Sequence, residues 1–164
     1  MQRFSSRKFV CAASLALILC NSGCGSNNPV TPPLGSGVLL ATTNDGDFSS
    51  QDALADSSNG IYTIHANVST SNGIFAIEVS LPKETTIPYS VDVATDPIGL
   101  ISYVNPAFVN PFVARQSFGS GTIQITQVSP TLMGTFRGIL WQDPPVGTDT
   151  VRGVTNGEFN APFQ

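Results

Sequence analysis

Charged residues are scarce in this chain: they make up 11% of its 164 residues, whereas hydrophobic residues make up 41%. This balance excludes a disordered chain, which combines many charges with few apolar residues. Long apolar runs are lacking too, since the longest covers residues 9–19 and a membrane-spanning helix needs about 20 residues. We therefore expect one folded domain of ordinary size without a helical membrane span.

Cysteine and histidine are nearly absent from most of the chain. Cys11, Cys20 and Cys24 all lie in the first 24 residues, and His65 is the single histidine. Disulfide bonds therefore cannot hold the remaining residues together. A metal site built from Cys and His is excluded by the same count, so only oxygen ligands are left.

The start of the chain has the order of a secretory signal peptide. Basic residues without an acidic one precede the apolar stretch 9–19, and small residues follow it. The end of this segment, Ser22-Gly23-Cys24, resembles the end of a lipobox, in which the cysteine is lipidated before cleavage on its N-terminal side. We expect a lipoprotein signal peptide over residues 1–23 and a lipid at Cys24.

Three alternatives to this assignment stay open. Cys20 is a second candidate for the lipid, although Leu19 stands immediately before it, where a small residue is usual. Cleavage without lipidation is another alternative, because Asn21 stands where lipoboxes usually carry Leu. The third is a buried helix over residues 9–19, which conflicts with its place at the chain start and its basic flank.

Residues 24–36 are rich in Pro, Gly and Asn, which disfavour both helix and sheet, and we expect them to form a flexible tether. With the leader removed, four basic residues face 11 acidic ones, a net charge of −7. A surface of this sign repels phosphate backbones, which excludes nucleic acid as a partner. Neutral or cationic ligands suit it better.

Residues 37–164 have the pattern of a single all-β domain. Apolar residues occupy every second position over 62–68 and 75–81, and Asn72-Gly73 between these stretches favours a hairpin turn. Further strands are expected over 38–43, 48–56, 89–93, 100–104, 112–117, 122–128, 132–141 and, as one strand or two, 150–163. Turns at residues 44–46 and 57–60 connect the first four strands into a meander. No helical period follows the leader, so we expect an antiparallel β-sandwich or partly closed barrel of about 8–10 strands.

Five short motifs follow the lipobox in order along the chain. They are Asp45-Gly46, Leu81-Pro82, residues 121–126 (GTIQIT), Gly134-Thr135-Phe136 and residues 155–159 (TNGEF). In this order the chain resembles an uncharacterised family of small bacterial lipoproteins, catalogued as a domain of unknown function. The resemblance implies an exported all-β domain, and it supplies no activity, cofactor or catalytic residue.

Candidates for catalysis are few. His65 is the only histidine able to act as a general base, and it falls on the polar side of a regular strand. No G-x-S-x-G motif is present. Glycoside hydrolysis needs two carboxylates about 5 to 10 Å apart, and no local pattern pairs Glu78, Glu84 and Glu158. We expect no enzymatic activity, with a small hydrolase as the alternative.

Four acidic residues lie within a stretch of twelve, at Asp45, Asp47, Asp52 and Asp56. Calcium takes six to eight oxygen ligands, and such carboxylates are suitable donors, yet the spacing does not fit an EF-hand loop. Turn formation and protection of strand edges explain these residues more simply. We expect no cofactor, and Asp45, Asp47 and Asp52 are kept as calcium candidates.

The stretch 103–118 combines aromatic residues with two Val-Asn-Pro repeats, and proline pre-forms a loop. Aromatic faces stack on sugar rings and peptides, so Tyr103, Phe108 and Phe112, together with Trp141, are the expected ligand-binding residues. In the alternative interpretation, Phe108 and Phe112 cap the open end of the core.

Together these patterns predict a non-enzymatic binding module on a membrane of the cell envelope. The outer membrane is favoured, on its periplasmic or surface-exposed side, and the lipid at Cys24 provides the membrane contact. The expected ligand is a glycan, a peptide or an envelope protein. A small envelope hydrolase and a structural subunit of an envelope complex are the alternatives. A hydrolase should form a concave catalytic pocket, and a binding module should expose an aromatic patch. A structural subunit should expose a long unpaired strand edge or a broad apolar face.

Overall fold

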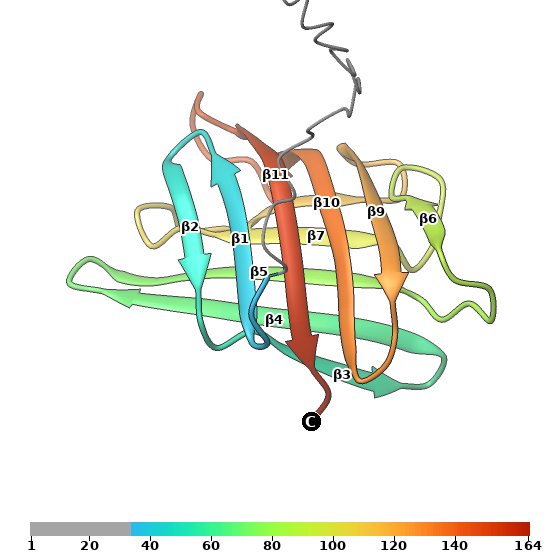
Figure 1. Ribbon diagram of the computed structural model, residues 1–164. Helices are drawn as coiled ribbons and strands as arrows, with labels where there is room; N and C mark the ends of the chain where they lie inside the picture. Colours follow the sequence, from blue (N-terminus) through green and yellow to red (C-terminus); the bar gives the residue numbers. More distant parts are fainter. Residues whose placement is uncertain (1–33) are drawn as a thin grey trace, which may run out of the picture. The chain divides into compact units, whose positions relative to one another are not determined.

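The computed structural model describes residues 34–164, which form an antiparallel β-fold (Figure 1). Its strands are β1 (Val38–Thr43), β2 (Gly46–Ser50), β3 (Leu54–Ser58), β4 (Ile61–Thr70), β5 (Gly73–Pro82), β6 (Tyr89–Asp92), β7 (Leu100–Val104), β8 (Phe112–Arg115), β9 (Ser120–Gln127), β10 (Thr131–Gln142) and β11 (Val151–Pro162). Within these residues no helix could cross a membrane. The expected signal-peptide helix, Cys24 and most of the tether lie outside the described residues.

The strands form one curled sheet that packs against itself. Its order is β2-β1-β11-β10-β8-β7-β5-β4-β3, and β9 and β6 branch from β10. Over most of its length β10 pairs with β9, whereas its last residues, Trp141 and Gln142, pair with β8. Figure 1 shows β2, β1, β11, β10 and β9 crossing in front of β4, β5 and β7. The result is a half-barrel, so the all-β antiparallel prediction is confirmed.

The core lies between the two crossing layers. Apolar residues at every second position of β4 and β5 are buried, as the alternation predicts. The buried members of this pair are Tyr62, Ile64, Ala66, Ile77, Val79 and Leu81. Among the described residues the hydrophobic cluster falls between Leu39 and Phe163, and they belong to one compact unit. A fragment of residues 33–164 therefore contains this core.

The prediction of one strand over residues 48–56, within a four-stranded meander, is wrong. The chain leaves β2 after Ser50 and begins β3 at Leu54, and β2 pairs with β1 whereas β3 pairs with β4. Two hydrogen bonds explain the break. The N–H of Ala53 donates to the carbonyl of Gly37, and the hydroxyl of Ser50 donates to the backbone carbonyl of Asn67. This crossing from one layer to the other helps raise the strand number to eleven.

The hairpin turns differ in their backbone conformation. Asn59 and Gly60 both have positive φ, 51° and 78°, as a two-residue turn that matches the strand twist requires. In the β4–β5 turn, Thr70 pairs with Gly73, and Gly73 has positive φ whereas Asn72 does not. The β4–β5 turn connects the two strands that the alternation predicts, whereas the turn at Asn59-Gly60 joins β4 to β3.

Candidate functional site

A half-exposed aromatic surface surrounds Trp141 near the end of β10. Trp141 is 48% exposed, and Ile139, two residues earlier on the same face of the strand, is 52% exposed. Val151 of β11 pairs directly with Trp141 and is 47% exposed. Together with Phe118, these residues form what we call the Trp141 surface.

The indole of Trp141 is held in place without being buried. The ring of Phe118 packs edge to face against it, with 5.6 Å between centroids. Phe118 is positioned in turn by backbone hydrogen bonds to Arg115, whose guanidinium lies 5.4 Å from the Phe118 centroid. Arg115 also forms a 2.7 Å ion pair with Asp143. These contacts restrict the rotation of an exposed indole, which pre-organises it for stacking.

A shallow groove of about 370 Å³ adjoins the Trp141 surface at Ile139. Its lining residues are Asp92, Ser120, Gly121, Thr122, Arg137, Gly138, Ile139, Val154 and Thr155. Gly121 and Gly138 pair across β9 and β10, and an added Cβ on Gly121 would lie 2.9 Å from Cδ1 of Ile101 in the opposite layer. The sheet therefore approaches its partner layer closely here, which leaves room for a hollow on the outside.

The Trp141 surface and its groove have the chemistry of a binding site. The groove offers hydroxyl groups together with one cation, Arg137, and one carboxylate, Asp92. An aromatic face beside such a rim can stack on an apolar ligand face while polar groups form hydrogen bonds.

The other aromatic residues predicted to bind a ligand lie elsewhere. Tyr103 is 2% exposed and Phe112 is fully buried, so the expectation of one exposed patch including them is wrong. Phe108 packs edge to face on Phe112, with 5.0 Å between centroids, and is partly buried against the core. Tyr103 and Phe112 point inward from β7 and β8, and together with Phe108 of the intervening loop they close one end of the core. This agrees with the alternative interpretation of the sequence. Of the four predicted residues, only Trp141 forms an exposed site.

A buried cation that the sequence analysis did not identify lies at this end of the core. The guanidinium of Arg152 packs against both Phe108 and Phe112, 4.6 and 4.7 Å from their centroids. Its Nε donates to Asp45 Oδ2 at 3.0 Å, and its Nη2 donates to Asp149 Oδ2 at 2.8 Å. We call these residues the Arg152 cluster, which joins three loops that are distant in sequence.

The electrostatics of the Arg152 cluster keep it charged. Hydrogen bonds and ion pairs with Asp149 and Asp45 raise the pKa of Arg152 above its already high value. The same contact lowers the pKa of Asp149. Since the nitrogens of Arg152 are used by these carboxylates and by the Val151 carbonyl, its role is structural. The sequence contained one indication of this burial. Arg152 lies two residues before the apolar Val154 and therefore on the same inward face of the strand.

His65 lies on the exposed outer face of β4. Its Nδ1 is 3.4 Å from Oε2 of Glu78, which stands opposite it on β5. Glu78 is in turn opposite Ser102 of β7, so the carboxylate lies between the imidazole and the hydroxyl. A catalytic triad needs the imidazole in the middle, and this arrangement therefore does not activate Ser102.

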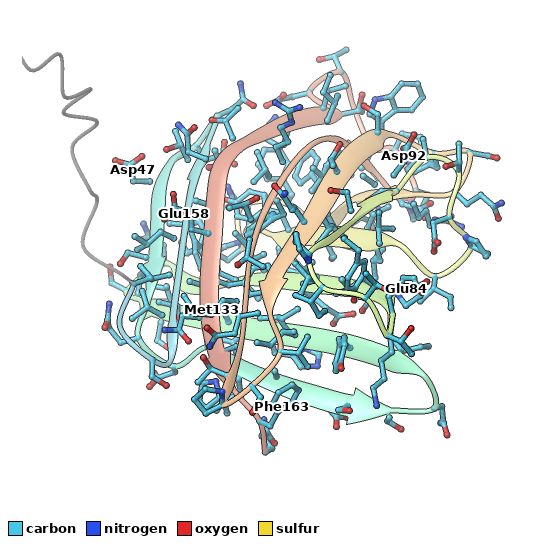
Figure 2. All side chains as sticks on the ribbon, turned by 45° about the vertical axis from the view of Figure 1, so that its right-hand side comes forward. Asp47, Glu84, Asp92, Met133, Glu158 and Phe163 are labelled. Carbon is cyan, nitrogen blue, oxygen red and sulfur yellow. The ribbon has the colours of Figure 1, made fainter. Side chains whose placement is uncertain are left out.

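The candidate carboxylates are dispersed. Figure 2 shows Glu84 and Asp92 on one side of the molecule and Asp47 and Glu158 on the other. Glu84, Asp92 and Asp96 line one hollow of about 490 Å³, but the last two accept backbone N–H groups and thereby shape their own loop. Asp45, a calcium candidate together with Asp47 and Asp52, is paired with Arg152 instead. In residues 34–164 no three potential metal ligands come together.

A comparison with known proteins finds no matching family model, no matching curated protein and no matching solved structure. The resemblance to a lipoprotein family of unknown function therefore stays a prediction. Functional inference rests on the site itself.

Proposed function

We propose that the protein is a non-enzymatic binding module of the cell envelope, anchored by a lipid at Cys24, that binds neutral glycans at the Trp141 surface. The observation that carries this proposal is the half-exposed Trp141, held edge to face by Phe118 beside a polar groove. Contiguous exposed apolar side chains on a small domain are characteristic of interaction sites.

The composition of the groove favours a glycan over a protein partner. A sugar ring presents an apolar C–H face for the indole and hydroxyl groups for the rim, where Arg137, Asp92 and Thr122 can form hydrogen bonds. The net charge of the exported part is negative, with four basic residues against 11 acidic ones, so neutral glycans fit better than anionic ones.

A structural subunit that assembles by strand addition is less well supported. The strands at the sheet edges are short, with five residues in β2, five in β3 and four in β6. Short edge strands limit the area over which a folded subunit can extend the sheet, although five residues are enough for a short peptide to pair.

Glycan binding can be followed directly, because Trp141 is the single tryptophan of the chain. We expect a saturable change in tryptophan fluorescence when the protein is titrated with its neutral oligosaccharide, identified on a glycan array. By calorimetry, Trp141→Ala should weaken binding about tenfold through loss of stacking, and Trp141→Phe should retain part of it.

Ile74→Ala is the matched control for this experiment. Ile74 is 57% exposed and lies on β5, away from the Trp141 surface, so its loss should not change the affinity. Unchanged affinity of Trp141→Ala, or an array on which no neutral glycan binds, would rule out the proposed site.

The anchor has its own test. We expect Cys24→Ala to abolish incorporation of labelled palmitate and to release the protein from the membrane fraction, because the acyl chains provide the membrane affinity. The control is Cys20→Ala, which should leave incorporation unchanged. Labelling that persists in Cys24→Ala and disappears in Cys20→Ala would move the lipid to Cys20.

A further inference from the structure

A third hollow, of about 160 Å³, lies at an open corner of the half-barrel and is called here the corner pocket. It is lined by Thr43, Asp45, Gly46, Asp47, Phe48, Ser49, Val68, Thr70, Phe75 and Tyr103. A cavity of about 150 Å³ in another protein admits a benzene molecule, so this volume accepts a small ligand group.

The corner pocket exists because β2 and the end of β4 meet without pairing. β2 is an edge strand whose only partner among the described strands is β1. Near its end, the hydroxyl of Ser50 donates to the carbonyl of Asn67 at 2.9 Å, which brings the two layers together. Figure 1 shows the β4–β5 hairpin extending past β2, so the layers diverge from this contact toward the hairpin turns.

The inner walls of the pocket are aromatic and apolar. Phe48 and Tyr103 are 6% and 2% exposed, and the partly buried Phe75 and Val68 complete the walls. Burial and the nearby charge of Asp45 raise the pKa of Tyr103, so its phenol stays neutral. The pocket therefore combines three aromatic rings with an uncharged hydrogen-bonding group.

The charge at the mouth of the pocket is negative. Two carboxylates, Asp45 and Asp47, line it, and none of its lining residues is basic. Arg152 forms ion pairs with both Asp45 and Asp149, so two carboxylates share its single positive charge. The Asp47 carboxylate forms no ion pair among residues 34–164, which leaves its negative charge unbalanced beside an aromatic cavity.

We propose that the corner pocket binds a primary alkylammonium group, presented as a lysine side chain of a peptide partner. An ammonium is attracted by aromatic faces and by carboxylates, and its apolar stem can pack on Phe48 and Phe75. A divalent metal fits less well, because the walls are apolar and it needs many oxygen ligands. The free edge of β2 favours a peptide, whose extended backbone can pair there while its side chain enters the pocket.

The proposal can be tested by NMR on the full chain in detergent micelles. We expect an acetylated, amidated lysine pentapeptide to shift the amide signals of residues 43–49 and 68–75, whereas the same peptide with norleucine does not. Norleucine keeps the stem and removes the charge. Equal binding of the two peptides, or shifts confined to other residues, would contradict an ammonium site.

n-Butylammonium distinguishes the two sources of the same group. Binding at least about tenfold weaker than that of the peptide supports a peptide partner, since backbone pairing then contributes. Equal binding supports the ammonium site and assigns a free amine as its ligand. Absence of binding by both molecules overturns the proposal.

A charge variant and its control complete the test. Asp47→Asn should weaken lysine-peptide binding about three- to fivefold, the upper part of the range for an exposed ion pair. Asp56→Asn, an exposed acid of β3 outside the pocket, removes the same charge and should leave the affinity unchanged. An equal loss in both variants would show general attraction by net charge and would argue against the pocket.

Discussion

Replacing Arg152 by Met should lower the free energy of unfolding by about 3 kcal/mol, the cost of breaking a buried ion pair. Arg152 is 5% exposed, and the Oδ2 atom of Asp45 receives hydrogen bonds from Arg152 Nε and Asn105 Nδ2. Without the guanidinium, the Asp45 carboxylate, whose side chain is 22% exposed, keeps only the neutral Asn105 amide as a side-chain donor. Phe108 and Phe112 also lose the cation that packs on both rings.

Urea unfolding of residues 33–164, followed by tryptophan fluorescence and circular dichroism, measures this loss. Adding Asp45→Asn to Arg152→Met should recover part of the stability, because no unpaired carboxylate then remains. The control is Arg137→Met on the exposed outer face, with an expected change below about 0.5 kcal/mol. Similar stabilities of the Arg152 and Arg137 variants would contradict a structural role for the Arg152 cluster.

The Arg152 cluster also connects stability with the corner pocket. Asp45 belongs to the β1–β2 turn, Phe108 to the loop after β7, and Asp149 to the loop before β11. A single guanidinium contacts all three, so it fixes the position of one pocket carboxylate. We attribute the shape of this end of the half-barrel to these contacts.

Gly134→Ala should destabilise the fold by about 3 kcal/mol, because the new methyl group would overlap atoms on both sides. A Cβ on Gly134 would lie too close to the carbonyl oxygen of Gln124 in β9 and 2.7 Å from Cζ of Phe159. Phe159 pairs directly with Gly134 across β10 and β11, and its ring is 1% exposed. Neither a paired backbone nor a buried ring can move without disturbing the core.

The same unfolding measurement applies to Gly134→Ala, and Gly35→Ala is its matched control. A Cβ on Gly35 would meet only Cγ2 of Val38, at an ordinary 3.7 Å, so this substitution should change stability little. Both variants lose glycine's conformational freedom in the unfolded chain, so the difference between their free energies of unfolding reports the steric overlap at Gly134. Equal unfolding midpoints would show that β9 and β11 adapt at Gly134.

The strand prediction succeeds where burial follows a strict alternation. In β4 and β5 every second residue is apolar, and these are the residues that the core buries. It fails over residues 48–56, because the hydrogen bonds of Ser50 and Ala53 that end β2 involve Asn67 and Gly37, which no local pattern relates to them.

The prediction of the binding site likewise succeeds for one residue and fails where burial depends on long-range contacts. Trp141 was identified from its residue type and is exposed, whereas Tyr103 and Phe112 are of similar type and are buried. Aromatic side chains suit both cores and binding surfaces, so composition does not distinguish these roles. Tyr103 belongs to the core because the pairing of β7 with β5 and β8 turns its ring inward.

By itself the amino-acid sequence determined the all-β class, most strand positions and the acidic charge. Alternation depends only on neighbouring residues, and net charge is a sum over the composition. Only the tertiary structure decided which aromatic residue is exposed, that Arg152 is buried against two rings, and that an acidic aromatic pocket opens beside β2. These features depend on contacts between residues as distant as Asp45 and Arg152, and such contacts arise only when the sheet curls and its layers cross.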